Sequence, residues 1–183
     1  AIARRAGKLI TLNSNIGKDS FESLHYDGVL VDKLKIEMGK ESKKNRVFFL
    51  HMMGSHGSYS SRYPKDFTRF DKLSRSEFGR LAFVKHVDSI NWYDNSIFYT
   101  DYVLNQVIES ISKSPRPTAL LFFPDHSEDV YRDLQHNGVK FNFDMTEIPL
   151  IFWASSQFQK RYPEKVEAFV ANQEKIFTND LVY

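Results

Sequence analysis

Short apolar segments alternate along this chain with longer segments of mixed polarity. Three of the short segments are apolar and rich in β-branched or aromatic residues, which predicts strands buried on both faces at residues 46–53, 118–123 and 147–154. Elsewhere apolar residues recur at helical spacing, which predicts helices over residues 27–38, 91–112 and 163–173. A further short β-prone run covers residues 8–13. We expect the first three strands to be neighbours in one sheet.

The order of these elements predicts the fold class. Buried strands that alternate with amphipathic helices are typical of an α/β fold, with a mainly parallel sheet sandwiched by helices. The 183 residues contain no internal repeat, linker or low-complexity tract, so we expect residues 1–183 to form a single domain. The chain does not begin with Met, and both of its ends resemble helices cut short, which predicts a piece of a longer protein.

Composition excludes several classes of protein. Cysteine is absent, which rules out a disulfide scaffold and cysteine-ligated zinc. The net charge is +2, with basic and acidic residues interleaved, so we expect no nucleic-acid partner. Sixteen Phe and nine Tyr supply an aromatic-rich core, which excludes disorder. No apolar run approaches the roughly 18–20 residues that a membrane span needs.

Two of the predicted strands lead into segments that contain candidate site residues. Sites in parallel α/β sheets form outside the carboxyl ends of the strands. The first strand is followed by Gly54-Ser55-His56-Gly57, and the second by Asp125-His126. A carboxylate and an imidazole that meet where the chain leaves a sheet suit zinc, which takes oxygen and nitrogen ligands. Two protein ligands are too few for a zinc site, so the remainder must come from elsewhere.

Each of these residues also has a plainer interpretation. Asp125-His126 could form a turn or a helix cap, and His56 and His136 could be ordinary loop histidines. Glu128 and Asp129 could simply cap the segment that follows them. The combination favours a site, because motifs with histidine follow two strand exits and His136 comes shortly after the second.

The same segments, taken together, resemble one family. Residues 51–64 resemble the H-x-M-G-S-H-G-x-x-Y…R-Y-P segment of bacterial phosphoethanolamine transferases. Residues 93–103 resemble the Y-D-N-T-x-x-Y-x-D helix of that family, and residues 125–128 resemble its D-H-G-E zinc motif. Residues 26–30 and 3–15 also fit. The resemblance covers nearly the whole chain and keeps the order of the motifs.

The resemblance implies a fold, a location and a reaction. The fold would be alkaline-phosphatase/sulfatase-like and incomplete, with this chain as the C-terminal portion of a catalytic domain. That domain would lie in the periplasm at the bacterial inner membrane, behind an N-terminal membrane anchor. The implied reaction moves phosphoethanolamine from phosphatidylethanolamine to lipopolysaccharide, on lipid A or the core, through a phosphorylated threonine. The cofactor would be zinc.

The motif match also implies roles for individual residues. Asp125 and His126 correspond to zinc ligands of the family. His56 corresponds to a ligand of the phosphate group or of a second metal, and His136 corresponds to a phosphate-binding histidine. The nucleophilic threonine and an early acidic ligand are expected upstream of this chain, so we assign no catalytic nucleophile here and expect the fragment alone to be inactive.

Two alternatives remain open. Ser127 stands where the family usually has Gly, and a loop that requires a positive φ there would be strained. The chain could therefore be a non-catalytic relative that binds a glycan or a lipid headgroup. It could also be another enzyme of the superfamily, a sulfatase-like hydrolase or a phosphoglycerol transferase, although residues 54–64 and the helix at 93–96 argue against this.

Overall fold

The computed structural model describes residues 5–12, 26–71, 87–131, 136 and 139–179. Four helices lie in these residues: α2 (Gly28–Met38), α3 (Val87–Ser112), α4 (Ser156–Arg161) and α5 (Pro163–Ala171). Two strands, β1 (Ala119–Phe122) and β2 (Ile151–Ala154), form a sheet. Three short 3-10 turns complete the list: η1 (Tyr59–Ser61), η2 (Lys65–Phe67) and η4 (Phe143–Met145).

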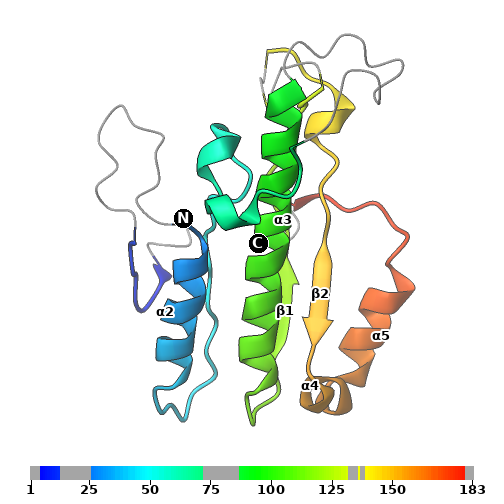
Figure 1. Cartoon of the computed structure of the whole chain (residues 1–183). Coiled ribbons are helices and arrows are strands. Elements are labelled where there is room, and N and C mark those ends of the chain that lie inside the picture. The colour runs from blue at the N-terminus through cyan, green and yellow to red at the C-terminus, as the bar shows by residue number, and fades with distance from the viewer. Residues whose placement is uncertain (1–4, 13–25, 72–86, 132–135, 137–138, 180–183) are drawn as a thin grey trace.

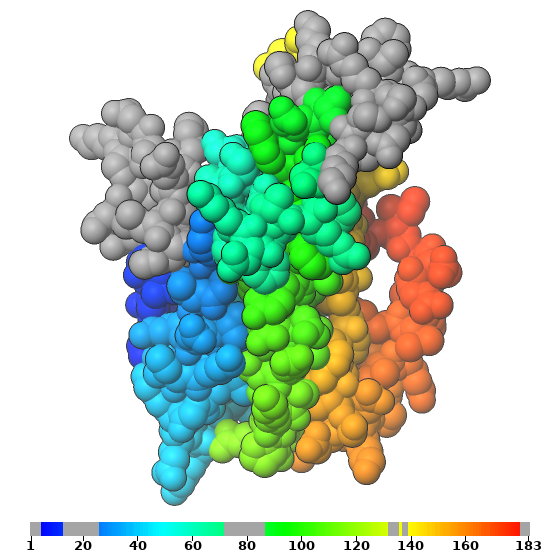
Figure 2. All heavy atoms as spheres, viewed as in Figure 1, coloured from blue at the N-terminus to red at the C-terminus, as the bar shows by residue number. Residues whose placement is uncertain are grey.

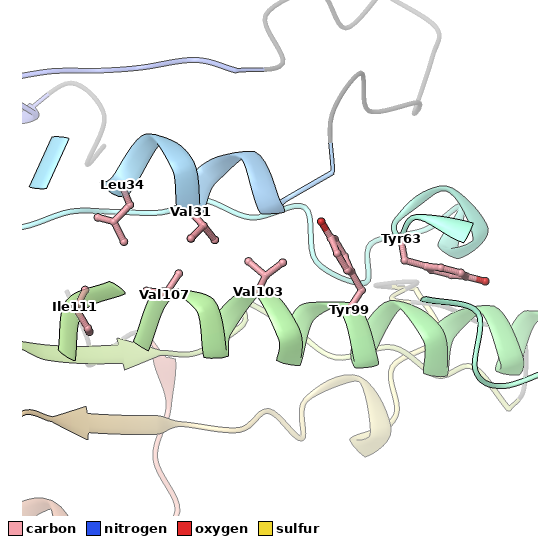
Figure 3. Close-up of a cluster of buried hydrophobic side chains, with 7 residues drawn as sticks. All are labelled: Val31, Leu34, Tyr63, Tyr99, Val103, Val107 and Ile111. Atoms are coloured by element: carbon pink, nitrogen blue, oxygen red, sulfur yellow. The ribbon is translucent and has the colours of Figure 1, made fainter. Parts of the chain in front are cut away.

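The core forms where α2 lies against α3. Apolar side chains spaced four residues apart on α3 (Val103, Val107 and Ile111) face Val31 and Leu34 of α2, as Figure 3 shows. This spacing places successive side chains on one face of a helix, so each turn of α3 contributes one residue to the core. The helices predicted at residues 27–38 and 91–112 are confirmed, and α3 begins a turn earlier than expected.

The sheet lies between two groups of helices, as predicted. Trp153 of β2 and Leu120 of β1 pack against the α2–α3 core. Phe152 faces the other way and stacks on Phe169 of α5, with ring centroids 3.9 Å apart. Figures 1 and 2 show α3 between α2 on one side and β2 on the other, with α5 beyond β2. Helix α5 confirms the helix predicted from residue 163, which has Pro at its start.

The direction of the strands differs from the prediction. The segments at 118–123 and 147–154 do pair, but β1 and β2 are antiparallel, with Ala119 opposite Ala154 and Phe122 opposite Ile151. For two neighbouring strands to be parallel, a crossover must return the chain to the end of the sheet at which the first strand began. Among the described residues between the two strands, the only helical element is η4. The chain re-enters the sheet at the same end at which it left, so the second strand runs in the opposite direction.

The prediction of a strand at residues 46–53 is wrong for this structure. These residues form no ladder with any described segment, and Val47 and Phe49 are 77% and 66% exposed instead of buried. A strand needs a hydrogen-bonded neighbour, which composition alone does not supply. The segment nevertheless contributes to the core, because Leu50 and Met52 pack against it. Residues 8–12 likewise form no strand, and Asn13 lies outside the described residues.

Candidate metal and phosphate site

Three histidines lie together beyond the carboxyl end of β1. The ring centroids of His126 and His136 are 4.2 Å apart, and those of His56 and His136 are 5.5 Å apart. His56 belongs to the loop that follows residues 46–53, whereas His126 and His136 follow β1. The structure therefore brings together histidines from the two segments that the sequence singled out. Their roles remain predictions.

The loop that carries His56 is held from two sides. The Asp27 carboxylate, at the start of α2, accepts hydrogen bonds from the amides of Met53 (3.0 Å) and Gly54 (2.8 Å). Buried Arg62 donates from Nε to the carbonyl of His56 (2.9 Å) and from Nη2 to that of Gly57 (2.7 Å). These bonds satisfy backbone groups that a loop cannot pair by itself. The position of His56 thus depends on contacts across the fold.

His126 has its two ring nitrogens in different surroundings. Nδ1 lies 3.0 Å from the carbonyl oxygen of Ser127, and because a carbonyl only accepts, Nδ1 carries the hydrogen. Nε2 lies 3.8 Å from the carboxylate oxygen Oδ1 of Asp125, whose side chain is 87% exposed. Asp125 and His126 therefore present a carboxylate oxygen and a ring nitrogen to the same region.

His136 is held by a carboxylate that the sequence did not assign to the site. Its Nδ1 lies 2.9 Å from Oε1 of Glu128, and Oε2 of Glu128 accepts a hydrogen bond of 3.0 Å from the hydroxyl of Tyr59. Glu128 and Tyr59 are both buried. The interpretation of Glu128 as a cap stays a prediction, because the segment that follows lies partly outside the described residues. Its place in the Asp125–Glu128 motif was the signal that indicated a role in the site. Asp129 is also buried, and its carboxylate accepts a hydrogen bond from the side chain of Asn142.

The electrostatic surroundings favour a neutral His56. Burial lowers the pKa of His56, and the positive charge of Arg62 lowers it further, against the opposing effect of the Glu128 carboxylate. Burial also raises the pKa of Tyr93, whose ring packs edge-on against Tyr59 at 5.2 Å between centroids. A neutral imidazole keeps a lone pair on one nitrogen, as a metal ligand or hydrogen-bond acceptor requires.

The residues present fit a zinc ion. One candidate ligand atom each from His126, Glu128 and His136 lies within 4.8 Å of the other two. Nitrogen and oxygen ligands suit zinc, and a tetrahedral shell with bonds near 2.0 Å places neighbouring ligand atoms about 3.3 Å apart. The 3.8 Å between His126 and Asp125 is close to that separation. In both His126 and His136, Nδ1 faces an oxygen, which leaves Nε2 for a ligand, the usual arrangement of metal-binding histidines.

Ser127 introduces no backbone strain at this site. Among the described non-glycine residues, only Ser58 has a φ in the left-handed region, at 64°. Gly54, in the same loop as Ser58, has a φ of 54°. The backbone at Ser127 is therefore one that any residue adopts, and the replacement of the family's Gly does not by itself argue for a loss of function.

Comparison with known proteins decides the family. The sequence model of the Sulfatase family matches residues 5–182. The chain belongs to the Sulfatase family. Phosphoethanolamine transferase EptA of Helicobacter pylori (strain ATCC 700392 / 26695) is 29% identical over 157 residues, which cover 83% of this chain and 30% of that protein. The Kdo(2)-lipid A phosphoethanolamine 7''-transferase of Escherichia coli (strain K12) is 26% identical over 147 residues, or 78% of this chain and 25% of that protein.

A solved structure supports the fold. The C-terminal periplasmic domain of EcEptC from Escherichia coli, in complex with Zn, superposes with a TM-score of 0.64 at 24% identity. The match covers 79% of this chain and 41% of that one. Together with the match to the Sulfatase family model, this likeness confirms an alkaline-phosphatase/sulfatase-like fold, of which the chain spans an incomplete part. The two curated relatives confirm the resemblance to phosphoethanolamine transferases. The chain spans between a quarter and a third of the length of these relatives. Among the described helices, none combines the length and the apolar character that a membrane span requires.

Proposed function

We propose that this chain is part of a zinc-dependent transferase that moves phosphoethanolamine from phosphatidylethanolamine to lipopolysaccharide, on lipid A or the core. The observation that carries this proposal is the group formed by His56, His126 and His136 in a chain of the Sulfatase family. Relatives that carry phosphoethanolamine transferase in their names, one of them acting on Kdo(2)-lipid A, support the choice of transferred group and acceptor.

The proposal includes a location and a domain boundary. Residues 1–183 form a single domain unit, the C-terminal portion of a catalytic domain in the periplasm. A membrane anchor outside this chain holds that domain at the inner membrane, where phosphatidylethanolamine is present. The likeness to a periplasmic domain of EcEptC supports this location.

Within the site, each residue has a separate task. Asp125 and His126 bind the zinc ion, whose charge stabilises negative charge that develops on the phosphoryl group. His56 and His136 bind the phosphate of the lipid headgroup. Arg62 and Asp27 keep the loop of His56 in place through their bonds to its backbone.

The transfer itself uses a threonine in the part of the protein outside this chain. The bond from phosphorus to the diacylglycerol oxygen breaks as a bond to the threonine oxygen forms, and diacylglycerol leaves with a proton. An oxygen of lipopolysaccharide then displaces the threonine and takes the phosphoethanolamine group. The residues of this chain hold the phosphate during both displacements.

Mass spectrometry of lipopolysaccharide tests the proposal. The full-length gene is expressed in a bacterial host whose lipopolysaccharide lacks the modification, and the host with a His126→Ala variant serves as the control. We expect a phosphoethanolamine addition with the wild type and none with the variant. A phosphoglycerol addition would assign the protein to another branch of the superfamily. An unmodified lipopolysaccharide, with a wild-type protein that is folded and present in the membrane, would overturn the proposal.

A further inference from the structure

A chain of hydrogen bonds connects Tyr59, the first residue of η1, through Glu128 to His136 of the site. The Tyr59 hydroxyl donates to Oε2 of Glu128 at 3.0 Å, and Oε1 of Glu128 lies 2.9 Å from Nδ1 of His136. The side chain of Glu128 is only 4% exposed, whereas that of His136 is 40% exposed. Tyr59 and Glu128 thus lie beneath the surface, and the imidazole of His136 reaches the solvent side of the site.

We propose that Tyr59 and Glu128 are positioning residues for His136, an inference that rests on the proposed function of the site. A carboxylate has no hydrogen to donate, so the hydrogen between Glu128 and His136 lies on Nδ1. Nε2, on the far side of the ring, then keeps its lone pair and is directed away from Glu128. Glu128 therefore fixes both the tautomer and the orientation of the imidazole.

Tyr59 acts on His136 only through Glu128. A glutamate side chain has several rotamers, and a single bond to His136 would leave it able to turn. The hydroxyl of Tyr59 holds the second oxygen and removes that freedom. The ring of Tyr59 is itself fixed, because it packs edge-on against Tyr93 of α3 at 5.2 Å between centroids. The long helix α3 thus supports the position of His136 through three side chains in series.

The burial of Glu128 also favours this role. A carboxylate removed from water is costly unless hydrogen bonds replace those that water made. Tyr59 and His136 supply one bond to each oxygen. If Glu128 only stabilised the fold, it would need no bond to His136, which is partly exposed. If Glu128 were only a helix cap, its carboxylate would accept from backbone amides.

Removal of the Tyr59 hydroxyl tests the proposal in the full-length enzyme. Tyr59→Phe keeps the ring and removes the hydroxyl that donates to Glu128. Loss of such a partner behind a functional histidine lowers activity by about 10- to 100-fold, and we expect the loss in kcat. Tyr63→Phe is the matched control, because Tyr63 is equally buried and its hydroxyl lies 3.4 Å from the side-chain nitrogen of Asn95. A Tyr59→Phe enzyme as active as Tyr63→Phe would overturn the proposal.

A double-mutant cycle separates positioning from a general effect on the fold. If Tyr59 acts through His136, then adding Tyr59→Phe to a His136→Ala enzyme lowers activity no further. Two losses that simply multiply would show that Tyr59 supports the protein in some other way and would contradict the proposal. Zinc content decides the role of Glu128: we expect Glu128→Gln to keep its zinc, and loss of a zinc ion would make Glu128 a metal ligand instead.

A measurement that does not depend on turnover keeps this inference distinct from the proposed function. With ¹⁵N-labelled histidine in the full-length protein, the ring nitrogens of His136 report which one carries the hydrogen. We expect the Nδ1–H form in the wild type and a mixture of the two forms in Tyr59→Phe. The same mixture in the wild type would overturn the inference even for an active enzyme. An inactive wild type with the expected Nδ1–H signal would reject only the function.

Discussion

The backbone amide of Gly28 donates a hydrogen bond of 3.1 Å to the hydroxyl of Tyr99, which joins the start of α2 to the middle of α3. A Cβ atom at position 28 would lie 2.7 Å from that hydroxyl, closer than real contacts allow. This bond fixes the residue next to Asp27, whose carboxylate holds the loop of His56. The packing of the two helices and the geometry of the site therefore share one close contact.

We expect Gly28→Ala to destabilise the protein by about 1–3 kcal/mol, since overpacking at a close contact forces the helices apart. Thermal unfolding of the enzyme measures the change. Gly39→Ala is the control, because a Cβ there would meet its nearest atoms at 3.5 and 3.6 Å and should cost little. Adding Tyr99→Phe to Gly28→Ala removes the clashing oxygen and should recover part of the loss. Equal stabilities for the two alanine variants would contradict this account.

Substitutions at the histidine site should separate metal binding from phosphate binding. In the full-length enzyme, Asp125→Ala and His126→Ala each remove a proposed zinc ligand, so we expect loss of the metal and of transfer. His56→Ala should keep most of the zinc and slow the reaction, because its proposed partner is the phosphate. Metal analysis beside an activity assay distinguishes these outcomes. A His126→Ala enzyme with full zinc and near-normal activity would reduce Asp125-His126 to a turn.

The isolated 183-residue chain should transfer no phosphoethanolamine. None of its threonines matches the context of a nucleophile, and without a covalent nucleophile the phosphoenzyme route is closed. The purified chain, incubated with zinc, phosphatidylethanolamine and lipopolysaccharide, is compared with the full-length enzyme by mass spectrometry. Transfer by the chain alone would show that a residue within it serves as the nucleophile.

The salt bridges of Glu37 predict a dependence of stability on pH. Hydrogen bonds from Lys40 and Lys8 lower the pKa of Glu37 to about 2, from an ordinary value of 4.5. Because the folded-state pKa is the lower one, the stabilisation is complete above about pH 4.5 and is lost as the pH falls toward 2. We expect Glu37→Gln to have a lower melting temperature than the wild type at pH 7, and a much smaller difference from the wild type at pH 2. The side chains of Lys8 and Lys40 are more than half exposed, whereas that of Glu37 is 14% exposed. Because both cations lie in water, the difference should be small and should shrink in added salt. A difference as large at pH 2 as at pH 7 would point to another cause.

The sequence determined the elements whose cause is local. Apolar side chains at helical spacing fix which face of α2 and α3 is buried, and this spacing can be seen without any knowledge of neighbours. The sequence also placed His56 and His126 close together, but on the assumption that residues 46–53 form a strand beside β1, and the structure shows no strand there. Motif order then indicated the family, which the comparisons confirm.

Tertiary structure alone decided the direction and partners of the strands and the connections within the site. An apolar run such as residues 46–53 has the same composition with or without a hydrogen-bonded neighbour, and β1 and β2 have the same composition in either direction. Glu128 has the sequence signature of a cap, and its bond to Tyr59 joins residues 69 positions apart. Such a bond depends on the rotamers of both side chains and on the helix behind them, which exist only once the chain has folded.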